Sequence, residues 1–68
     1  MLVFETRADI ENWVMNRFPY SWVTPEMATD VARALRAERL VEYGKPIDEA
    51  QQQVIGERVM TVLAELAG

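Results

Sequence analysis

The chain has 68 residues, half of them hydrophobic, and its eleven acidic and seven basic side chains give it a formal net charge of −4. This length predicts a single domain, residues 1–68, at the size where one core supplies only about 3–5 kcal/mol of net stability. The chain contains neither cysteine nor histidine, which excludes disulfides and the usual zinc sites as additional stabilisation. Oligomerisation is the stabilising device that remains, so we expect a homodimer.

The same composition excludes most kinds of catalytic and ligand site. Ser21 is the only serine, and the chain has no histidine or cysteine to form a catalytic pair with it. Gly44, Gly56 and Gly68 are too far apart to form a phosphate-binding loop. We expect no catalytic residue, no cofactor and no metal ion. No apolar run approaches the roughly 18 residues of a membrane span, and the first residues, MLVFETR, do not form a signal peptide. We therefore expect a cytoplasmic protein without a membrane contact.

The first predicted helix spans residues 7–18. Thr6 can act as its N-cap, and Asp9, three residues later, completes a variant of the capping box. Pro19 ends the helix because the residue before a proline avoids the helical conformation. The apolar arm that precedes the helix could form a strand, but a strand needs a second one to pair with. We therefore interpret Phe4, in this arm, as a side chain that fills a gap in a helical core.

The connection after this helix, residues 19–23, contains Tyr20 and Trp22, and two interpretations of them are open. If exposed, they would form an aromatic anchor for a partner, since tyrosine and tryptophan dominate binding hot spots. If buried, they would fill the core of a domain that needs large side chains, each of which buries about 150–250 Å².

The second predicted helix, residues 25–42, is the best marked in the chain. Thr24 provides its N-cap, and Pro25 fits its first position. Gly44 provides a left-handed stop, and Pro46 cannot prolong the helix.

This helix has a fault near its end. Glu38 falls in the middle of the apolar face, where a lone carboxylate is costly to bury, while Leu40 and Tyr43 fall off that face. Either the helix stops near Ala37 and the chain continues in another direction, or it persists to about Glu42 and a second surface covers Leu40 and Tyr43. We prefer the longer helix, which makes these two residues part of a self-association surface.

The third predicted helix spans residues 48–66. Asp48 and Gln51 form a D-x-x-Q variant of the capping box at its start. Its main apolar stripe has the spacing of a short coiled-coil seam and consists of Ile55, Val59, Val62 and Leu66. A coiled coil needs about three or four heptads, so we interpret the stripe as one face of a helix that packs within the chain.

These elements predict an all-α fold, a small three-helix domain with a short extended arm at its N-terminus, packed as a homodimer. Such a domain buries one apolar face of each helix. The predicted core consists of Phe4, Ile10, Trp13, Val14, Phe18, Met27, Val31, Leu35, Ile55, Val59, Val62 and Leu66.

Arg33, Arg36 and Arg39 recur at every third position on the polar side of the second helix. Arginine recognises carboxylates and phosphates through a planar fork, so this arginine ridge could contact an acidic partner or a nucleic-acid backbone. The simpler interpretation is a solvated face, in which Asp30 and other acids offset the positive charge.

The run from Val31 to Tyr43, VARALRAERLVEY, resembles the recognition helix and first wing strand of winged helix-turn-helix DNA-binding proteins. The resemblance covers about a fifth of the chain. It implies that Leu40 and Val41 lie on a strand, which would explain the position of Glu38, and that the arginine ridge contacts DNA. No base-contacting residue is carried over from this family.

Two functions of different class follow from these observations. The first is a non-catalytic protein-interaction module, such as a small adaptor, inhibitor or regulatory subunit of the kind common among bacterial and phage regulators. The second is a winged-helix-like DNA-binding transcriptional regulator, which the negative net charge disfavours. The candidate partner-binding residues, in order of preference, are Tyr20, Trp22, Leu40, Tyr43, Arg33, Arg36 and Arg39.

Overall fold

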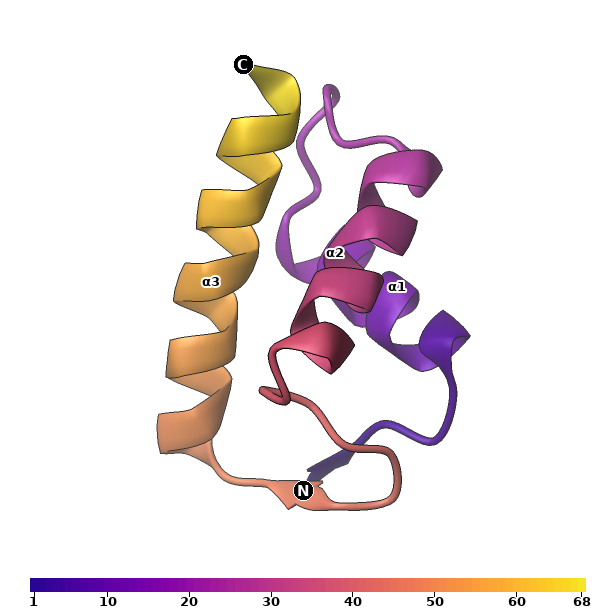
Figure 1. Cartoon of the computed structure of the whole chain (residues 1–68), viewed down its shortest axis with the longest axis vertical. Coiled ribbons are helices and arrows are strands. Elements are labelled where there is room, and N and C mark those ends of the chain that lie inside the picture. Colours follow the sequence, from indigo (N-terminus) through magenta and orange to yellow (C-terminus); the bar gives the residue numbers. More distant parts are fainter.

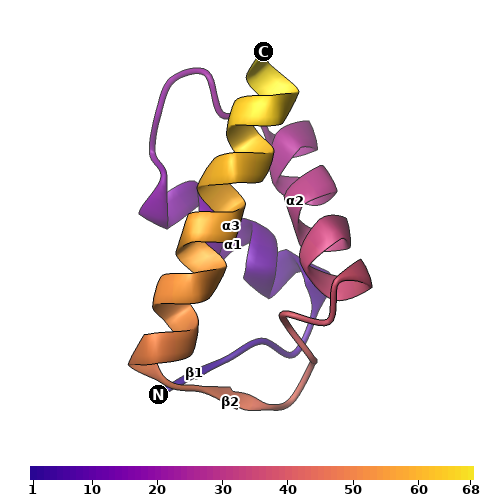
Figure 2. The same ribbon diagram turned by 60° about the vertical axis from the view of Figure 1, so that its left-hand side comes forward.

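The computed structural model describes residues 1–68 and contains three helices and two very short strands. In chain order these are β1 (Leu2–Val3), α1 (Arg7–Arg17), α2 (Pro25–Ala37), β2 (Pro46–Ile47) and α3 (Glu49–Ala67). α2 contacts both other helices and runs in the opposite direction to α3 (Figure 1). The strands lie at one end of the molecule, near the start of α3, and the connection between α1 and α2 lies at the other end (Figure 2). The predicted helical fold is confirmed, and the small sheet is an addition to it. None of the helices combines the length and the apolar character that crossing a membrane requires.

All three helices begin at the caps that the sequence predicts. The Thr6 hydroxyl accepts a hydrogen bond from the Asp9 amide, and the Asp9 carboxylate accepts one from the Thr6 amide, which completes the capping box of α1. Asp48 and Gln51 form the same reciprocal pair at the start of α3. At the start of α2, the Thr24 hydroxyl accepts from the Met27 amide at 3.1 Å. Each cap satisfies amides that have no partner within the helix.

Fifteen hydrophobic side chains form one core, and no polar side chain is buried with them. Most of the predicted core is confirmed, although Trp13 and Met27 are only half-buried and pack against its edge. Leu66 is a wrong prediction, since 44% of it is exposed. It lies on the expected side of α3 but in the last turn, where its side chain stays uncovered. The buried residues that the prediction omitted are Val23, Ala28, Ala32, Val41, Ile47 and Leu63.

The end of α2 corrects the prediction of a helix over residues 25–42, because the helix stops at Ala37. Arg39 follows with a φ of +60°, the left-handed conformation in which a helix commonly ends. The Leu40 amide donates to the Leu35 carbonyl at 3.0 Å, and the Arg39 amide donates to the Arg36 carbonyl at 3.1 Å. These two bonds are those of a Schellman motif. Leu40 therefore folds back and packs against the core. Its position does not require α2 to extend beyond Ala37.

This ending implies strain at Arg39. A left-handed conformation costs a residue with a Cβ atom about 1–2 kcal/mol, whereas glycine adopts it freely. We expect Arg39→Gly to raise the free energy of unfolding by about 1 kcal/mol, measured by urea denaturation. The matched control is Arg33→Gly, an exposed position within α2, where glycine should cost up to about 1 kcal/mol. A loss of stability in both variants would contradict the assignment of Arg39 as the helix stop.

The N-terminal arm is both a strand and a source of core packing. Leu2 pairs with Ile47 and Val3 pairs with Pro46 in an antiparallel two-stranded sheet. Directly after β1, Phe4 is 1% exposed, and its carbonyl accepts a hydrogen bond from the Gly44 amide at 2.8 Å. The arm is thus joined to the segment between α2 and α3 by backbone hydrogen bonds and by a buried ring.

The pairing of the sheet also tests whether the chain has the wing of winged helix-turn-helix proteins. Leu40 and Val41 do not lie on a strand, and the strand that follows α2, β2, pairs with the N-terminal arm. The chain then enters α3, so no second wing strand returns to β2. The expectation of a recognition helix followed by a wing is therefore wrong for the fold.

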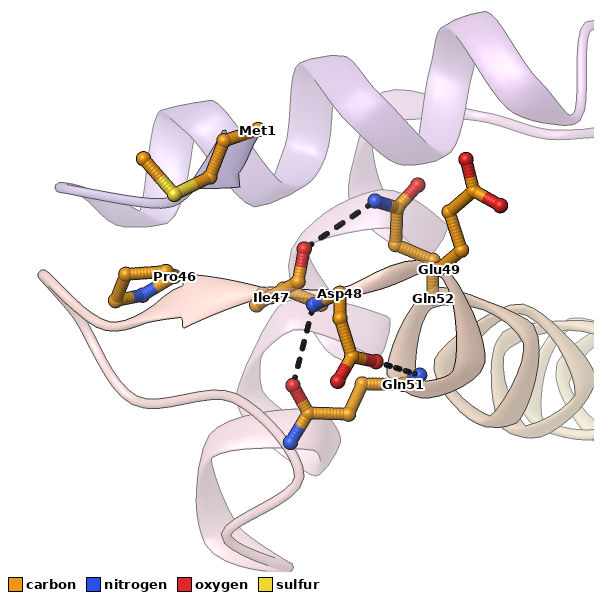
Figure 3. A pocket seen from close by; sticks show the side chains of 7 residues that line it. All are labelled: Met1, Pro46, Ile47, Asp48, Glu49, Gln51 and Gln52. Atoms are coloured by element: carbon orange, nitrogen blue, oxygen red, sulfur yellow. Dashed lines mark hydrogen bonds between the residues drawn. The ribbon is translucent and has the colours of Figure 1, made fainter.

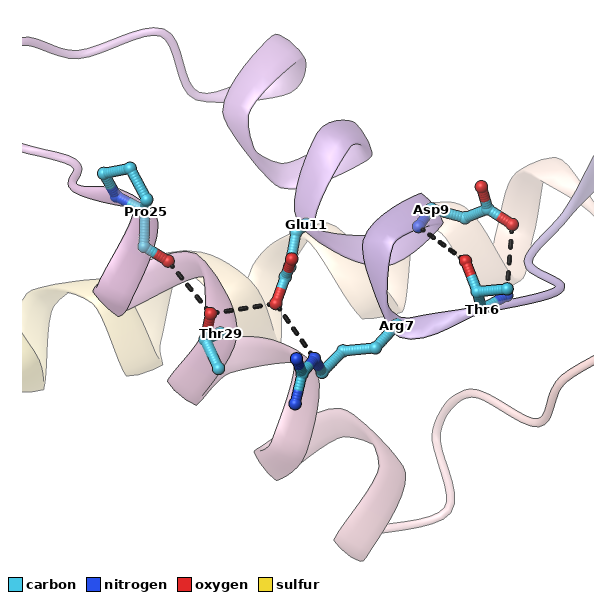
Figure 4. A network of polar contacts seen from close by, with 6 residues as sticks. All are labelled: Thr6, Arg7, Asp9, Glu11, Pro25 and Thr29. Carbon is cyan, nitrogen blue, oxygen red and sulfur yellow. Dashed lines mark hydrogen bonds and ion pairs between the residues drawn. The ribbon is translucent and has the colours of Figure 1, made fainter.

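A polar network joins α1 to α2 (Figure 4). The Glu11 carboxylate accepts a hydrogen bond from the Thr29 hydroxyl at 2.8 Å and forms an ion pair with Arg7 at 3.2 Å. The pair with Arg7 has the predicted i,i+4 spacing within α1, while Thr29 belongs to α2. Glu11 therefore links α1 to α2. The sequence indicates only its contact with Arg7 and not the contact with Thr29.

Candidate functional site

Five aromatic rings form a continuous series from the core to the surface. In the order Phe4, Trp13, Phe18, Tyr20 and Trp22, neighbouring ring centroids lie 5.9, 6.5, 6.4 and 5.7 Å apart. The first two pairs meet edge to face, as buried aromatic rings commonly do. The last pair is stacked and exposed, so the series connects the core directly to a surface feature.

Tyr20 and Trp22 form that surface feature, which we call the aromatic pair. Their rings are nearly parallel, with 9° between the planes, and 46% of Tyr20 and 43% of Trp22 are exposed. A turn holds them: the Val23 amide donates to the Tyr20 carbonyl at 3.1 Å, and the Val23 side chain is buried. Of the two interpretations left open by the sequence, the exposed one describes both side chains.

Arg17 covers Trp13, the half-buried member of the series. Its guanidinium lies 5.4 Å from the centroid of the Trp13 ring. A Cβ atom built on Gly56 of α3 would come to 3.4 Å from the Arg17 side chain. The glycine in the middle of α3 thus lies beneath an arginine from α1, and no close crossing of helix backbones is needed to explain it.

The arginine ridge does not form one continuous face. Arg36 donates to the Val41 carbonyl at 3.2 Å, and its guanidinium lies 4.2 Å from the centroid of the Tyr43 ring. Arg39 lies beyond the end of α2, and only Arg33 projects from the helix without an internal partner. The middle arginine therefore holds the segment after α2, and its guanidinium lies over one face of Tyr43, which is still 38% exposed.

Five of the seven basic side chains have a partner within the molecule. Three form ion pairs and two lie over aromatic rings: Arg7 with Glu11, Lys45 with Glu42, Arg58 with Glu38, Arg17 with Trp13 and Arg36 with Tyr43. Only Arg33 and Arg39 remain without one. The acidic side chains outnumber the basic ones, so most of the charge left free on the surface is negative.

Leu40 borders a second candidate surface at the opposite end of the molecule from the aromatic pair. A shallow hollow of about 360 Å³ lies between the end of α2 and the start of α3. Its apolar lining consists of Leu40, Ala50, Val54 and Ile55, and Arg39 also lines it. Val54 is 53% exposed. The sequence indicates this residue only by its position off the main stripe of α3. Tyr20 and Trp22 are not brought together with Leu40, Tyr43 or the arginines.

The largest hollow, of about 530 Å³, lies where β2 enters α3 (Figure 3). Three of its polar side chains are already hydrogen-bonded: Asp48 and Gln51 cap the helix, and the Gln52 amide donates to the Ile47 carbonyl at 3.3 Å. The Glu49 carboxylate and the N-terminal ammonium of Met1 also line the hollow, but they have opposite charges and do not form a set of like groups directed at one ligand. No three acidic side chains in the molecule come together in a group that could hold a metal ion.

Glu38, the residue at the fault in the predicted helix, caps α2 and joins it to α3. Its two carboxylate oxygens accept from the Nε and Nη2 of Arg58, both at 2.8 Å. These hydrogen bonds lower the pKa of the Glu38 carboxyl below its ordinary value of 4.5. The carboxylate thus lies outside the core, which removes the cost of burying it.

The ion pair between Glu38 and Arg58 predicts that the stability of the fold depends on pH. Because the pKa of Glu38 is lower in the folded state, the unfolded state binds its proton first as the pH falls. The contribution of Glu38 is therefore present at neutral pH and is lost as the pH falls below about 4.5. We expect Glu38→Gln to lose less stability than the wild type between pH 7 and pH 3, in urea titrations at each pH. Glu57→Gln, an exposed carboxyl without an ion pair, is the control; an unchanged slope for Glu38→Gln would contradict the argument.

The features above define a small helical domain with an exposed aromatic pair at one end and a shallow apolar hollow at the other. Comparison with known proteins adds no family to this description: no family model, no curated protein and no solved structure matches the chain.

Proposed function

We propose that this protein is a non-catalytic protein-interaction module that binds its partner through the aromatic pair. The observation that supports the proposal is the stacked, exposed geometry of Tyr20 and Trp22. A domain of 68 residues has few large side chains with which to fill its core, yet two of its aromatic residues are held at the surface by a turn. Tyrosine and tryptophan at such positions are the residues that contribute most to protein interfaces.

The way the pair is held favours binding. The turn closed by Val23 and the stacking of the two rings restrict their rotamers before any partner arrives. A side chain that is already ordered loses less conformational entropy on association, and the cost for a mobile one is about 0.5–1.5 kcal/mol. The partner therefore meets a preorganised apolar surface.

Quantitative affinity capture from the native host tests this function. The immobilised wild type is compared with a Tyr20→Ser, Trp22→Ser double variant and with Val54→Ser, which removes an exposed apolar side chain elsewhere. We expect a partner that the wild type and Val54→Ser retain and the double variant loses. Against the purified partner, the double variant should bind about 30-fold more weakly, the effect of a hot spot worth about 2 kcal/mol. Equal retention by all three proteins, with circular dichroism showing that each is folded, would contradict the proposal.

Self-association is a second candidate, favoured by the hollow beside Leu40 and Val54. A second copy that covers this surface would bury the side chain of Val54, the more exposed of the two. A standard interface takes about 800 Å² from each partner, a large share of the 4368 Å² that this chain exposes. Such a dimer therefore needs more of α3 than the hollow alone.

Light scattering at micromolar concentration tests the dimer. Leu40 packs against the core, so the informative variant is Val54→Glu, which places a charge on the proposed interface without disturbing the interior. We expect a dimeric wild type and a monomeric Val54→Glu protein. A wild type that is already monomeric would dispose of this candidate and leave the aromatic pair unaffected.

A DNA-binding regulator, the alternative function, would have to rely on Arg33 and Arg39, the two arginines without internal partners. The net charge of −4 opposes it, because binding to duplex DNA depends on neutralising phosphates. We expect no shift of duplex DNA in a gel even at low salt. Binding that weakens steeply as salt is raised would favour the alternative.

A further inference from the structure

We propose that the partner segment bound at the aromatic pair is basic and places an arginine side chain against the rings of Tyr20 and Trp22. The proposal rests on the function proposed above and names the chemistry of the partner at the same site. Two independent features of the molecule carry it: the distribution of guanidinium groups over its aromatic rings, and the distribution of charge around the pair.

The chain covers its other tyrosine and tryptophan with arginine. It contains two tyrosines and two tryptophans. Arg17 lies over Trp13, with its guanidinium 5.4 Å from the ring centroid, and Arg36 lies over Tyr43 at 4.2 Å. Tyr20 and Trp22 have no such cation, although their rings are the more exposed. The faces of electron-rich rings attract guanidinium groups, so the pair offers to a partner the contact that the chain makes internally at the other two rings.

The charge around the pair has the complementary sign. Glu26 lies in the first turn of α2, four residues after Trp22, and Glu65 lies near the end of α3. The start of α2 and the end of α3 lie at the same end of the molecule as the connection between α1 and α2 (Figures 1 and 2). Neither forms an ion pair, unlike Glu11, Glu38 and Glu42. Glu65 also interacts electrostatically with Arg58, so Glu26 is the carboxylate of the two without an internal cation. It favours the approach of a positively charged segment and opposes an acidic one.

The two cations without an internal partner lie away from the aromatic pair. Arg39 follows the end of α2 that lies opposite the aromatic pair, and Arg33 lies in the second half of the same helix. Arg17, the basic side chain closest in sequence to the pair, lies over Trp13, and its guanidinium keeps its positive charge there. Among basic side chains, arginine fits best because its planar guanidinium stacks on aromatic faces and is more weakly hydrated than the lysine ammonium.

A peptide titration followed by NMR tests the inference. The probe is a short peptide of alternating arginine and glycine, and its matched controls replace every arginine by citrulline, which keeps the shape and removes the charge, or by glutamate. We expect the arginine peptide to shift the indole N–H signal of Trp22 and the amides of residues 20–24, and to leave the indole signal of Trp13 in place. The citrulline and glutamate peptides should bind at least about fivefold more weakly.

Two variants locate the interaction. Trp22→Leu keeps an apolar side chain but removes the ring, and should weaken the arginine peptide by about two- to fivefold. Glu26→Gln combined with Glu65→Gln should weaken it and make the remaining affinity less sensitive to salt. Arg39→Ser, at the other end of α2, is the control and should leave the affinity unchanged.

Equal binding of the arginine and citrulline peptides, or shifts confined to another surface, would overturn the inference. Stronger binding of a leucine–glycine peptide would also overturn it, because the aromatic pair would then bind an apolar segment. A concentration-dependent dimer that Trp22→Leu abolishes would overturn it as well, because the pair would then bind a second copy of the chain. The failure remains distinct from a failure of the proposed function. If the double variant of the capture experiment still loses its partner while no basic peptide binds, the aromatic pair is an interface and only its partner's charge has been misassigned.

Discussion

Phe4→Ala is expected to leave the chain unfolded at 25 °C. Phe4 is 1% exposed and meets the Trp13 ring edge to face at 5.9 Å. Truncating a buried phenylalanine to alanine typically costs about 3–5 kcal/mol, and a domain of this length has only about 3–5 kcal/mol of net stability. The expected loss therefore equals the whole net stability of the domain.

Far-UV circular dichroism and urea denaturation measure this loss, with Phe4→Leu as the matched control. Leucine keeps most of the buried volume and should cost about 1.5 kcal/mol or less. If Phe4→Ala melted within a few degrees of the wild type, the N-terminal arm would lie outside the cooperative unit. Its pairing with β2 and the hydrogen bond from Gly44 would then contribute nothing to the stability of the core.

Leu63→Ala is expected to cost about 2–5 kcal/mol, the typical effect of removing a fully buried leucine side chain. Leu63 is 0% exposed and packs in the core, whereas Leu66, one turn further along α3, is 44% exposed. Leu66→Ala should therefore change the free energy of unfolding by only about 0.5 kcal/mol. The two variants make the same chemical change on the same helix, so their difference reports burial alone.

Parallel urea titrations of these two variants test which of the two leucines is buried. The structure buries Leu63, whereas the apolar stripe predicted from the sequence buries Leu66. Equal losses would mean that the last turn of α3 is covered, either by another part of the chain or by a second copy. A larger loss at Leu66 than at Leu63 would contradict the rotation of α3 that the structure shows.

The starts of the helices could be predicted because each depends on side chains within three residues of the cap. The bonds of Thr6 with Asp9 and of Asp48 with Gln51 are local, so spacing alone identifies them. The sequence offers the observed end of α2 near Ala37 as one of two alternatives but does not decide between them, because the residue in the left-handed conformation is Arg39 and not glycine. Gly44 also has a positive φ, of +80°, but it serves a later turn and not the helix end.

The sheet and the limits of the buried core could not be predicted from the sequence, because they depend on contacts between segments that are distant in the chain. Leu2 pairs with Ile47 across most of the chain, and no local pattern indicates that register. Val41 is buried only because the Schellman motif turns the chain back at Leu40. The apolar side of α3 is visible in the sequence, but the point at which its covering ends, between Leu63 and Leu66, is a property of the neighbouring elements.

In the candidate site, too, local features could be predicted from the sequence and long-range contacts could not. The sequence singles out Tyr20 and Trp22 by their residue type and their place in a connection, but it leaves open whether they are buried. Their stacking and exposure depend on the turn that Val23 anchors in the core. The absence of a guanidinium over either ring becomes visible only once Arg17 and Arg36 are placed over the other two.

Acrylamide quenching of tryptophan fluorescence, in single-tryptophan variants with and without the captured partner, tests most directly whether the protein acts through its aromatic pair. Trp13→Phe leaves Trp22 as the only tryptophan, and Trp22→Phe leaves Trp13. Trp22 should be quenched readily in the free protein and protected when the partner is bound, while Trp13, half-buried beneath Arg17, should be quenched weakly in both states. If Trp22 is as shielded as Trp13 in the free protein, or if the partner binds without protecting it, the aromatic pair is not the surface through which this protein acts.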